Sequence, residues 1–188
     1  MKSRAHVKTA AFALAIAAGL CRLPVDAQPA GIEHVDFRDG TAFFSNEIHR
    51  LKSGRLAAPD KTDTVLWAAI EPPAFGYVAG YPSELAAILV HFGDRGGTGF
   101  FSELNLFSLR EGKLVMIADL PGGDRAEGGF HSVKISDGRL VVEVYAPPAG
   151  GGGCCPAYVD TVRYRFAGGK LVKAGKASRR QALQDKDY

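Results

Sequence analysis

The frequent glycines that separate short segments are the feature of this 188-residue chain that most restricts its fold. Of its 23 glycines, all but Gly19 lie after residue 27, and many of them separate short apolar or alternating segments. Such segments, bounded by turn residues, are typical of strands, and they do not alternate with helical patterns. The sequence therefore predicts an all-β fold, an antiparallel sheet built from hairpins. A sandwich, a barrel and a curved sheet all remain open.

About eight to ten strands are expected. The clearest is Val162–Phe166, whose alternation places Arg163 and Arg165 on one face of a strand and its apolar residues on the other. The apolar run Leu85–Phe92 predicts either a strand buried on both faces or a short buried helix. Asp137-Gly138 predicts a two-residue hairpin turn, because both central positions of such a turn need a positive φ. The other expected strands are 35–38, 41–44, 48–51, 65–70, 100–109, 113–119, 130–136, 139–145 and one opening at 171, with a short helix near 178–184.

The first 27 residues have the layout of a cleaved signal peptide. A basic segment precedes the apolar run Ala10–Leu20, and small residues at Val25 and Ala27 stand before a cut at Gln28. The run is shorter than the roughly 20 residues that span a bilayer, and no later segment is apolar for long enough. We expect a periplasmic or secreted protein. Lipoprotein anchoring at Cys21 is the disfavoured alternative, since bulky Leu20 precedes it.

Removing residues 1–27 leaves 19 basic and 19 acidic side chains, so charge gives no reason to expect nucleic-acid binding. The sequence predicts one β-rich domain over residues 28–173 and a basic C-terminal tail over residues 174–188. Residues 170–188 carry a net charge of +4 and residues 28–169 a net charge of −4. The tail is interpreted as a solvated end, with docking onto an acidic surface or an envelope polymer as the alternative.

The mature chain would keep only two cysteines, the neighbours Cys154 and Cys155. A disulfide between neighbours closes almost no loop and stabilises by about 1 kcal/mol, whereas a cis non-proline peptide costs about 3–4 kcal/mol. Such a disulfide, expected in an oxidising compartment, would be a rigid loop lock or a redox-sensitive element. Two reduced thiols, intermolecular pairing and metal binding are the alternatives, and metal binding lacks further ligands in the sequence.

Three glycine-containing motifs follow one another: Gly96-Gly97-Thr98-Gly99, Gly122-Gly123-Asp124-Arg125-Ala126 with Gly128-Gly129 behind it, and Cys154-Cys155-Pro156. In this order, over roughly residues 76–173, they resemble a family of exported bacterial β-rich domains with GGTG, GGDRA–GG and CCP loops. The resemblance implies export, a β-rich fold and no assigned catalytic activity. Members often carry an aspartate-rich loop before the apolar strand. Here the stretch Ala79–Glu84 keeps one carboxylate, so calcium binding is not expected.

Candidate binding residues lie on these loops: Gly96, Gly97, Thr98, Gly99, Asp124, Arg125, Glu127 and His131. No nucleophile elbow, P-loop or metal-ligand spacing accompanies them, and no cofactor is expected. We therefore predict a non-enzymatic envelope domain that binds a protein or polymer partner through the loops at 93–99, 121–129 and 147–156. The alternatives are a thiol- or disulfide-sensitive protein that uses Cys154-Cys155, and a hydrolase built on His131 with Asp124 or Glu127.

Overall fold

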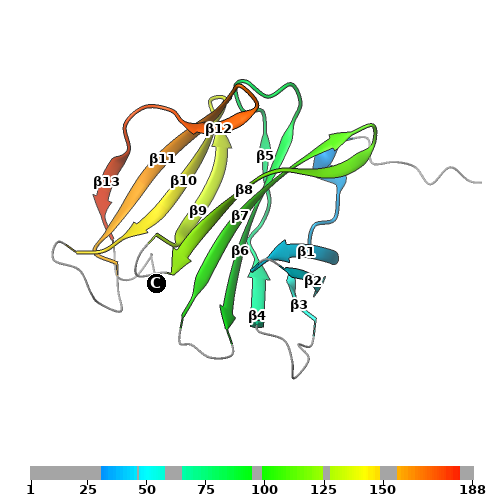
Figure 1. The fold of residues 1–188 in the computed structure, drawn as a ribbon, viewed down its shortest axis with the longest axis horizontal. Helices are drawn as coiled ribbons and strands as arrows, with labels where there is room; N and C mark the ends of the chain where they lie inside the picture. The colour runs from blue at the N-terminus through cyan, green and yellow to red at the C-terminus, as the bar shows by residue number, and fades with distance from the viewer. Residues whose placement is uncertain are drawn as a thin grey trace, which may run out of the picture.

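A computed structural model describes residues 31–45, 47–57, 65–94, 99–124, 128–148 and 156–182. Within these ranges the chain is all-β apart from one 3-10 turn, η1 (Ile32–His34), which confirms the predicted antiparallel fold class (Figure 1). Sheet A pairs β1 (Gly40–Phe44), β2 (Glu47–Lys52), β3 (Arg55–Leu56), β4 (Val65–Ile70), β6 (Leu85–Asp94), β7 (Phe101–Arg110) and β8 (Lys113–Asp124) in that order, and β5 (Ala74–Gly76) joins β6. Sheet B has the order β12 (Lys170–Lys173), β11 (Tyr158–Ala167), β10 (Arg139–Ala146), β9 (Phe130–Ser136), and β13 (Ser178–Gln181) joins β11.

The predicted hairpin at Asp137-Gly138 is present because its turn chemistry is local, and a second hairpin joins β7 to β8. Asp137 and Gly138 have φ values of 52° and 65° and connect β9 to β10, as the Asp-Gly turn predicts. Glu111 and Gly112 do the same between β7 and β8, with φ values of 53° and 74°. The short strands β3 and β5 were not predicted. Each is too brief, at 2 and 3 residues, to show an alternating pattern.

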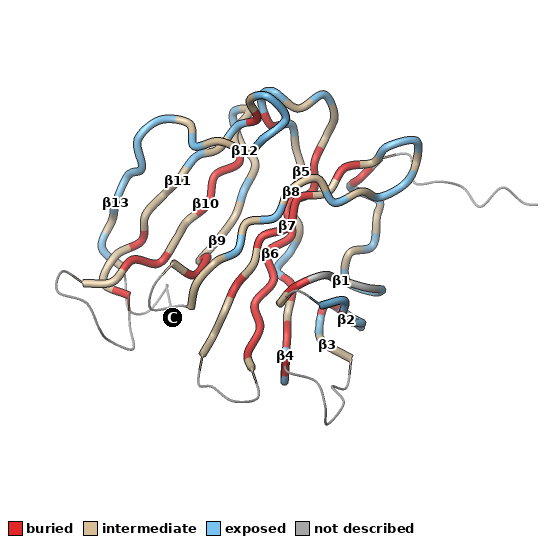
Figure 2. Tube along the Cα trace, viewed as in Figure 1, coloured by how far each residue is buried: buried red, intermediate tan, exposed pale blue. Residues whose placement is uncertain are grey.

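Strand β6 is buried on both faces, which decides between the two interpretations of its apolar run (Figure 2). Its alternate residues enter two different cores. Ile88 and Val90 pack with β1, β2 and β4 inside the curl of sheet A, whereas Leu85 and Leu89 face sheet B. The inter-sheet core continues with Leu104 and others from β7 and with apolar residues of β9, β10 and β11. β6 thus contributes side chains to both cores, one from each of its faces.

Sheets A and B are connected where the chain passes from β8 of sheet A to β9 of sheet B. The backbone N–H of Phe130 donates a 2.6 Å hydrogen bond to Oγ of buried Ser102 on β7. Pro121 lies on β8, which is an edge strand of sheet A, and an edge tolerates a residue that has no N–H to donate. The hydrogen bond from Phe130 to Ser102 therefore joins β9, an edge strand of sheet B, to β7 of sheet A.

Two sequence predictions are wrong. Residues 178–181, placed in a short helix, form β13 and pair with Tyr158–Thr161 of β11. Arg179 and Arg180 are good helix formers, but the open edge of β11 and two acidic partners outweigh that weak preference. Residues 35–38, expected as a strand, are bends without a ladder partner.

Candidate functional site

The described flanks of the three glycine-containing loops lie at one end of the two sheets (Figure 1). Phe101 at the start of β7 is paired with Asp124 at the end of β8. The N–H of Gly129 donates to the carbonyl of Asp124 at 2.7 Å, and the N–H of Gly128 donates to the carbonyl of Tyr145 on β10 at 2.9 Å. Continuous backbone hydrogen bonding therefore connects the flank of the first loop to that of the third.

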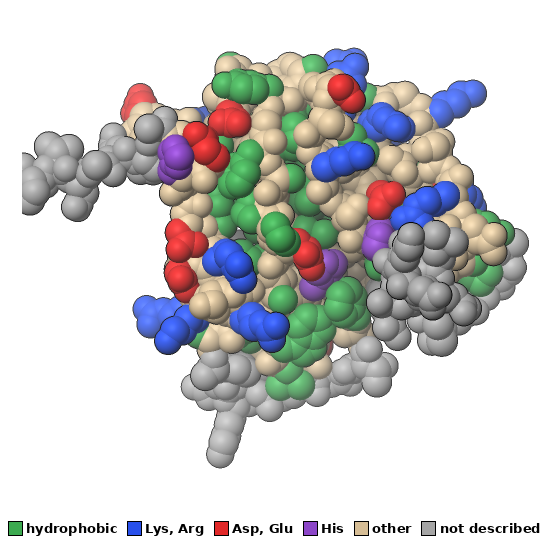
Figure 3. All heavy atoms as spheres, turned by 180° about the vertical axis from the view of Figure 1, so that it is seen from behind, with side chains coloured by type: hydrophobic (Ala, Val, Ile, Leu, Met, Phe, Trp, Pro, Cys, Tyr) green, Lys and Arg blue, Asp and Glu red, His purple; other side chains and the backbone are tan. Residues whose placement is uncertain are grey.

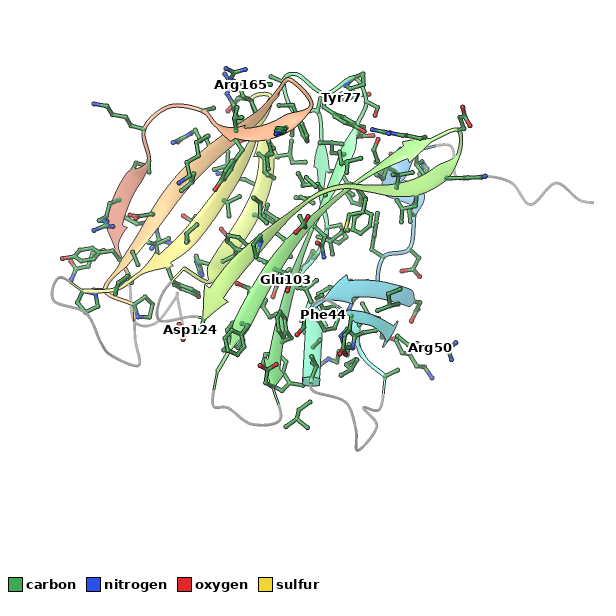
Figure 4. All side chains as sticks on the ribbon, in the orientation of Figure 1. Phe44, Arg50, Tyr77, Glu103, Asp124 and Arg165 are labelled. Atoms are coloured by element: carbon green, nitrogen blue, oxygen red, sulfur yellow. The ribbon has the colours of Figure 1, made fainter. Side chains whose placement is uncertain are left out.

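Only part of the predicted loop set falls within the described residues. Gly99, Asp124 and His131 do, and Figure 4 labels Asp124 at the end of β8. The rest, together with the predicted disulfide pair, lie outside the described residues: Gly96, Gly97, Thr98, Arg125, Glu127, Cys154 and Cys155.

A β-bulge brings His131 to the outer face of sheet B, the face turned away from the inter-sheet core. Ser132 pairs with Glu143, but the next pair joins Phe130 to Val144, so His131 is the extra residue on β9. Phe130 points into the inter-sheet core. The bulge therefore places His131 and Ser132 together on the opposite face, beside Glu143. Bulges of this kind often re-aim side chains next to functional sites.

Five side chains form what we call the Glu143 network: His131, Ser132, Glu143, Tyr145 and Arg180. Nδ1 of His131 lies 3.0 Å from the hydroxyl of Tyr145, and its Nε2 lies 3.6 Å from Oε2 of Glu143. The Ser132 hydroxyl donates to Oε2 of Glu143 at 2.8 Å, and Arg180 on β13 reaches both carboxylate oxygens at 3.5 Å. The Ser132 hydroxyl thus donates its hydrogen bond to the Glu143 carboxylate.

The Glu143 carboxylate is kept ionised by its neighbours. Burial by itself raises the pKa of Glu143. The hydrogen bonds from Ser132 and Arg180, with the positive charge of Arg180, outweigh burial and hold the pKa below its ordinary value. At neutral pH the network therefore holds an ionised Glu143 paired with the Arg180 guanidinium.

A second histidine, His91 on β6, lies near the network. It is 8% exposed, its ring stacks on Phe100 with centroids 4.9 Å apart, and its Nδ1 has no hydrogen-bond partner among the described residues. Burial lowers the pKa of His91, and the charge of His131 adds to this, although nearby Glu71 acts in the opposite direction. The 3.8 Å contact from Nε2 to Glu71 is therefore not an ion pair at neutral pH, because the imidazole is uncharged there.

Replacing His91 with phenylalanine is expected to flatten the pH dependence of stability below pH 6.5. The unfolded chain takes up a proton near the ordinary histidine pKa of 6.5, which the folded chain resists, so the native protein loses stability as the pH falls through this value. Urea unfolding at pH 7.5 and pH 5.5 measures the difference. The control is His34→Phe, which makes the same substitution at a histidine whose side chain is 64% exposed. An equal pH dependence in His91→Phe and wild type would contradict the burial argument.

A groove of about 390 Å³ runs along the outer face of sheet B beside the network. Its lining includes three hydroxyl residues, three basic residues and two acidic ones: Ser132, Ser136, Thr161, Lys134, Arg139, Arg163, Asp137 and Glu143. Strand alternation explains this composition, since Leu140 and Val142 between these positions point into the core. Figure 3 shows basic side chains on the sheet B side of the molecule and a second group on the sheet A side.

Sequence reasoning identified His131 but missed the groove and the other members of the Glu143 network. The alternation of β11 already separated Arg163 and Arg165 from the apolar face, and that was the available signal. Nothing local indicates that Arg180 meets Glu143, because the two residues are 37 positions apart.

No family model, curated protein or solved structure matches the chain. Among the described residues, no helix is long and apolar enough to cross a membrane. In the same parts of the chain, no group of three or more His, Cys, Asp or Glu side chains is arranged to hold a metal ion.

Proposed function

We propose that this protein is an exported, non-enzymatic binding domain of the cell envelope, which holds a protein or polymer partner on the outer face of sheet B and at the adjoining loop end. The observation that carries the proposal is the groove of about 390 Å³, a size typical of ligand-binding clefts. It is lined by polar and charged side chains on a sheet whose other face is packed in the core.

Three further features support the proposal. The leader pattern of residues 1–27 predicts export, and the three loop motifs resemble a family of exported β-rich domains. The flanks of these loops lie close to the groove. The carbonyl of Tyr145 accepts a hydrogen bond from Gly128 in the loop flank, and the Tyr145 hydroxyl is hydrogen-bonded to His131, which is next to the groove residue Ser132. The Glu143 network, in turn, shares Ser132 and Glu143 with the groove.

Capture from an envelope fraction tests this function. Immobilised residues 28–188 are expected to retain a specific component, identified by mass spectrometry for protein and by sugar analysis for polymer. Substituting the groove residues Lys134, Arg139 and Arg163 with alanine is expected to lower its recovery about tenfold or more. The control substitutes Arg50, Lys52 and Arg55 of sheet A, which removes the same charge elsewhere. Equal recovery by the groove variant and the wild type would refute binding at this face.

A further inference from the structure

Basic side chains occupy neighbouring positions on the outer face of sheet B. Lys134 on β9, Val141 on β10 and Arg163 on β11 form one cross-strand row. Arg139 and Arg165 lie two residues along from Val141 and Arg163, on the same face by strand alternation. Four cations therefore lie near Val141, which is 6% exposed and has Glu143 on its remaining side.

Within the described part of the chain, no acidic side chain pairs with these cations. Among the described residues, Lys134, Arg139 and Arg163 make no ion pair, and Arg165 only reaches the carbonyl of Phe166 at 3.5 Å. The basic residues of β13 differ. Arg179 makes a two-pronged contact with Asp160 at 2.7 and 2.8 Å, and Arg180 contacts Glu143. Like charges on neighbouring strand positions are destabilising, so the uncompensated group favours a bound anion.

The acidic residues of the groove do not remove this excess. Glu143 is already paired with Arg180 and hydrogen-bonded to Ser132. Asp137 lies in the β9–β10 turn, at one end of the groove. Lys134, Arg139 and Arg163 line the groove from three adjacent strands, which together span about 10 Å across the sheet.

We infer that this groove binds an acidic polysaccharide, a chain of sugars that carries carboxylate groups at intervals. The inference rests on the proposed function and names the class of polymer. Arginine and lysine would pair with the carboxylates, and the hydroxyls of Ser132, Ser136 and Thr161 would bond to sugar hydroxyls. The cations are distributed over three strands with hydroxyls between them, and the volume of about 390 Å³ exceeds the size of one oxyanion. An extended polyhydroxylated acid fits this distribution better than a single phosphate does.

The experiment measures binding of polygalacturonate to residues 28–188 by calorimetry in low salt. Dextran is the neutral sugar probe and polyphosphate the phosphate probe. Polygalacturonate is expected to bind, with an affinity that falls as salt is raised, and to bind more tightly per anionic group than polyphosphate. Dextran is expected not to bind. No binding of polygalacturonate, or tighter binding of polyphosphate, would overturn the inference.

A matched pair of variants locates the site. Arg163→Glu with Arg165→Glu reverses two exposed charges on β11 and is expected to weaken polygalacturonate binding about 30-fold. Arg50→Glu with Lys52→Glu reverses two exposed charges at the same spacing on β2 and is expected to change affinity less than about threefold. Figure 4 shows Arg165 and Arg50 far apart on the molecule. Equal losses in both variants would show attraction by net charge alone and would overturn the assignment to this groove.

Circular dichroism verifies folding, and the milder Lys134→Gln with Arg139→Gln replaces the β11 variant if that one does not fold. The double substitution Lys134→Gln with Arg139→Gln is expected to weaken binding about tenfold.

The capture experiment and the polysaccharide experiment together separate the two proposals. Capture of an envelope component other than an acidic polysaccharide, lost in the groove variant, would remove this inference and leave the binding function standing. Unchanged capture by the groove variant would remove both.

Discussion

Gly80→Ala is expected to destabilise the native state by about 3 kcal/mol or more, a large part of the stability of a domain of this size. Gly80 has a φ of +86°, a conformation that costs alanine about 1–2 kcal/mol. An added Cβ would also overlap the carbonyl oxygen and carbon of Phe166 on β11. These backbone atoms belong to sheet B and cannot rotate away as a flexible side chain could.

Substitution at Gly80 is expected to be costly because the residues around it are hydrogen-bonded to sheet B. The N–H of Ala79 donates to the carbonyl of Gly138, and the N–H of Phe166 donates to the carbonyl of Ala79, both at 2.8 Å. Any shift that relieves the overlap at Gly80 stretches these hydrogen bonds. The expected loss therefore combines backbone strain with lost contact between the sheets.

Gly168→Ala is the matched control. Gly168 also has a positive φ, at +57°, but an added Cβ there meets nothing within 4 Å. Its substitution is expected to cost about 1 kcal/mol, from backbone conformation alone. Urea unfolding of both variants measures the difference, which isolates the overlap with β11. Equal losses would mean that the segment around Gly80 does not bind sheet B as closely as its hydrogen bonds indicate.

Leu104→Ala is expected to cost about 3–4 kcal/mol. Leu104 is fully buried at the centre of β7 and belongs to the core between the sheets. Deleting its side-chain carbons removes apolar burial and leaves a cavity, and such changes cost about 2–5 kcal/mol in packed cores. The upper part of this range is expected here, because hydrogen-bonded strands β6 and β8 on either side hold the backbone and limit collapse.

Leu114→Ala makes the same chemical change on β8, where the side chain belongs to a residue that is 41% exposed. Its expected cost is below about 1 kcal/mol, because little packing is lost. Chemical denaturation with fluorescence of Trp67 follows both variants. If Leu104→Ala cost no more than Leu114→Ala, the two sheets would not share a packed core.

Much of the fold could be predicted because its causes are local. The Asp137-Gly138 turn needs positive φ at two positions, and Asp-Gly supplies residues that tolerate it. Alternation in Val162–Phe166 identified the core-facing Tyr164 and Phe166. The short helix expected near 178–184 failed because the preference of its residues is weak, whereas the edge of β11 and its acidic side chains lie elsewhere in the sequence.

Less of the candidate site could be predicted, because its contacts join distant residues. His131 was singled out for its neighbours Asp124 and Glu127, yet the carboxylate beside it is that of Glu143 on the next strand. A one-residue bulge decides this, by placing His131 on the outer face together with Ser132. A bulge depends on how two strands pair, so the sequence of one strand does not indicate it.

The sequence by itself determined most of the longer strands and the Asp137-Gly138 turn, because side-chain alternation and turn conformation depend on residues close together in the chain. It also determined which residues of β11 are basic and which are apolar. Only the tertiary structure decided that Arg180 pairs with Glu143, while Lys134, Arg139 and Arg163 have no ion-pair partner among the described residues. The physical reason is that charge compensation depends on distances across strands, which are fixed by sheet order and register.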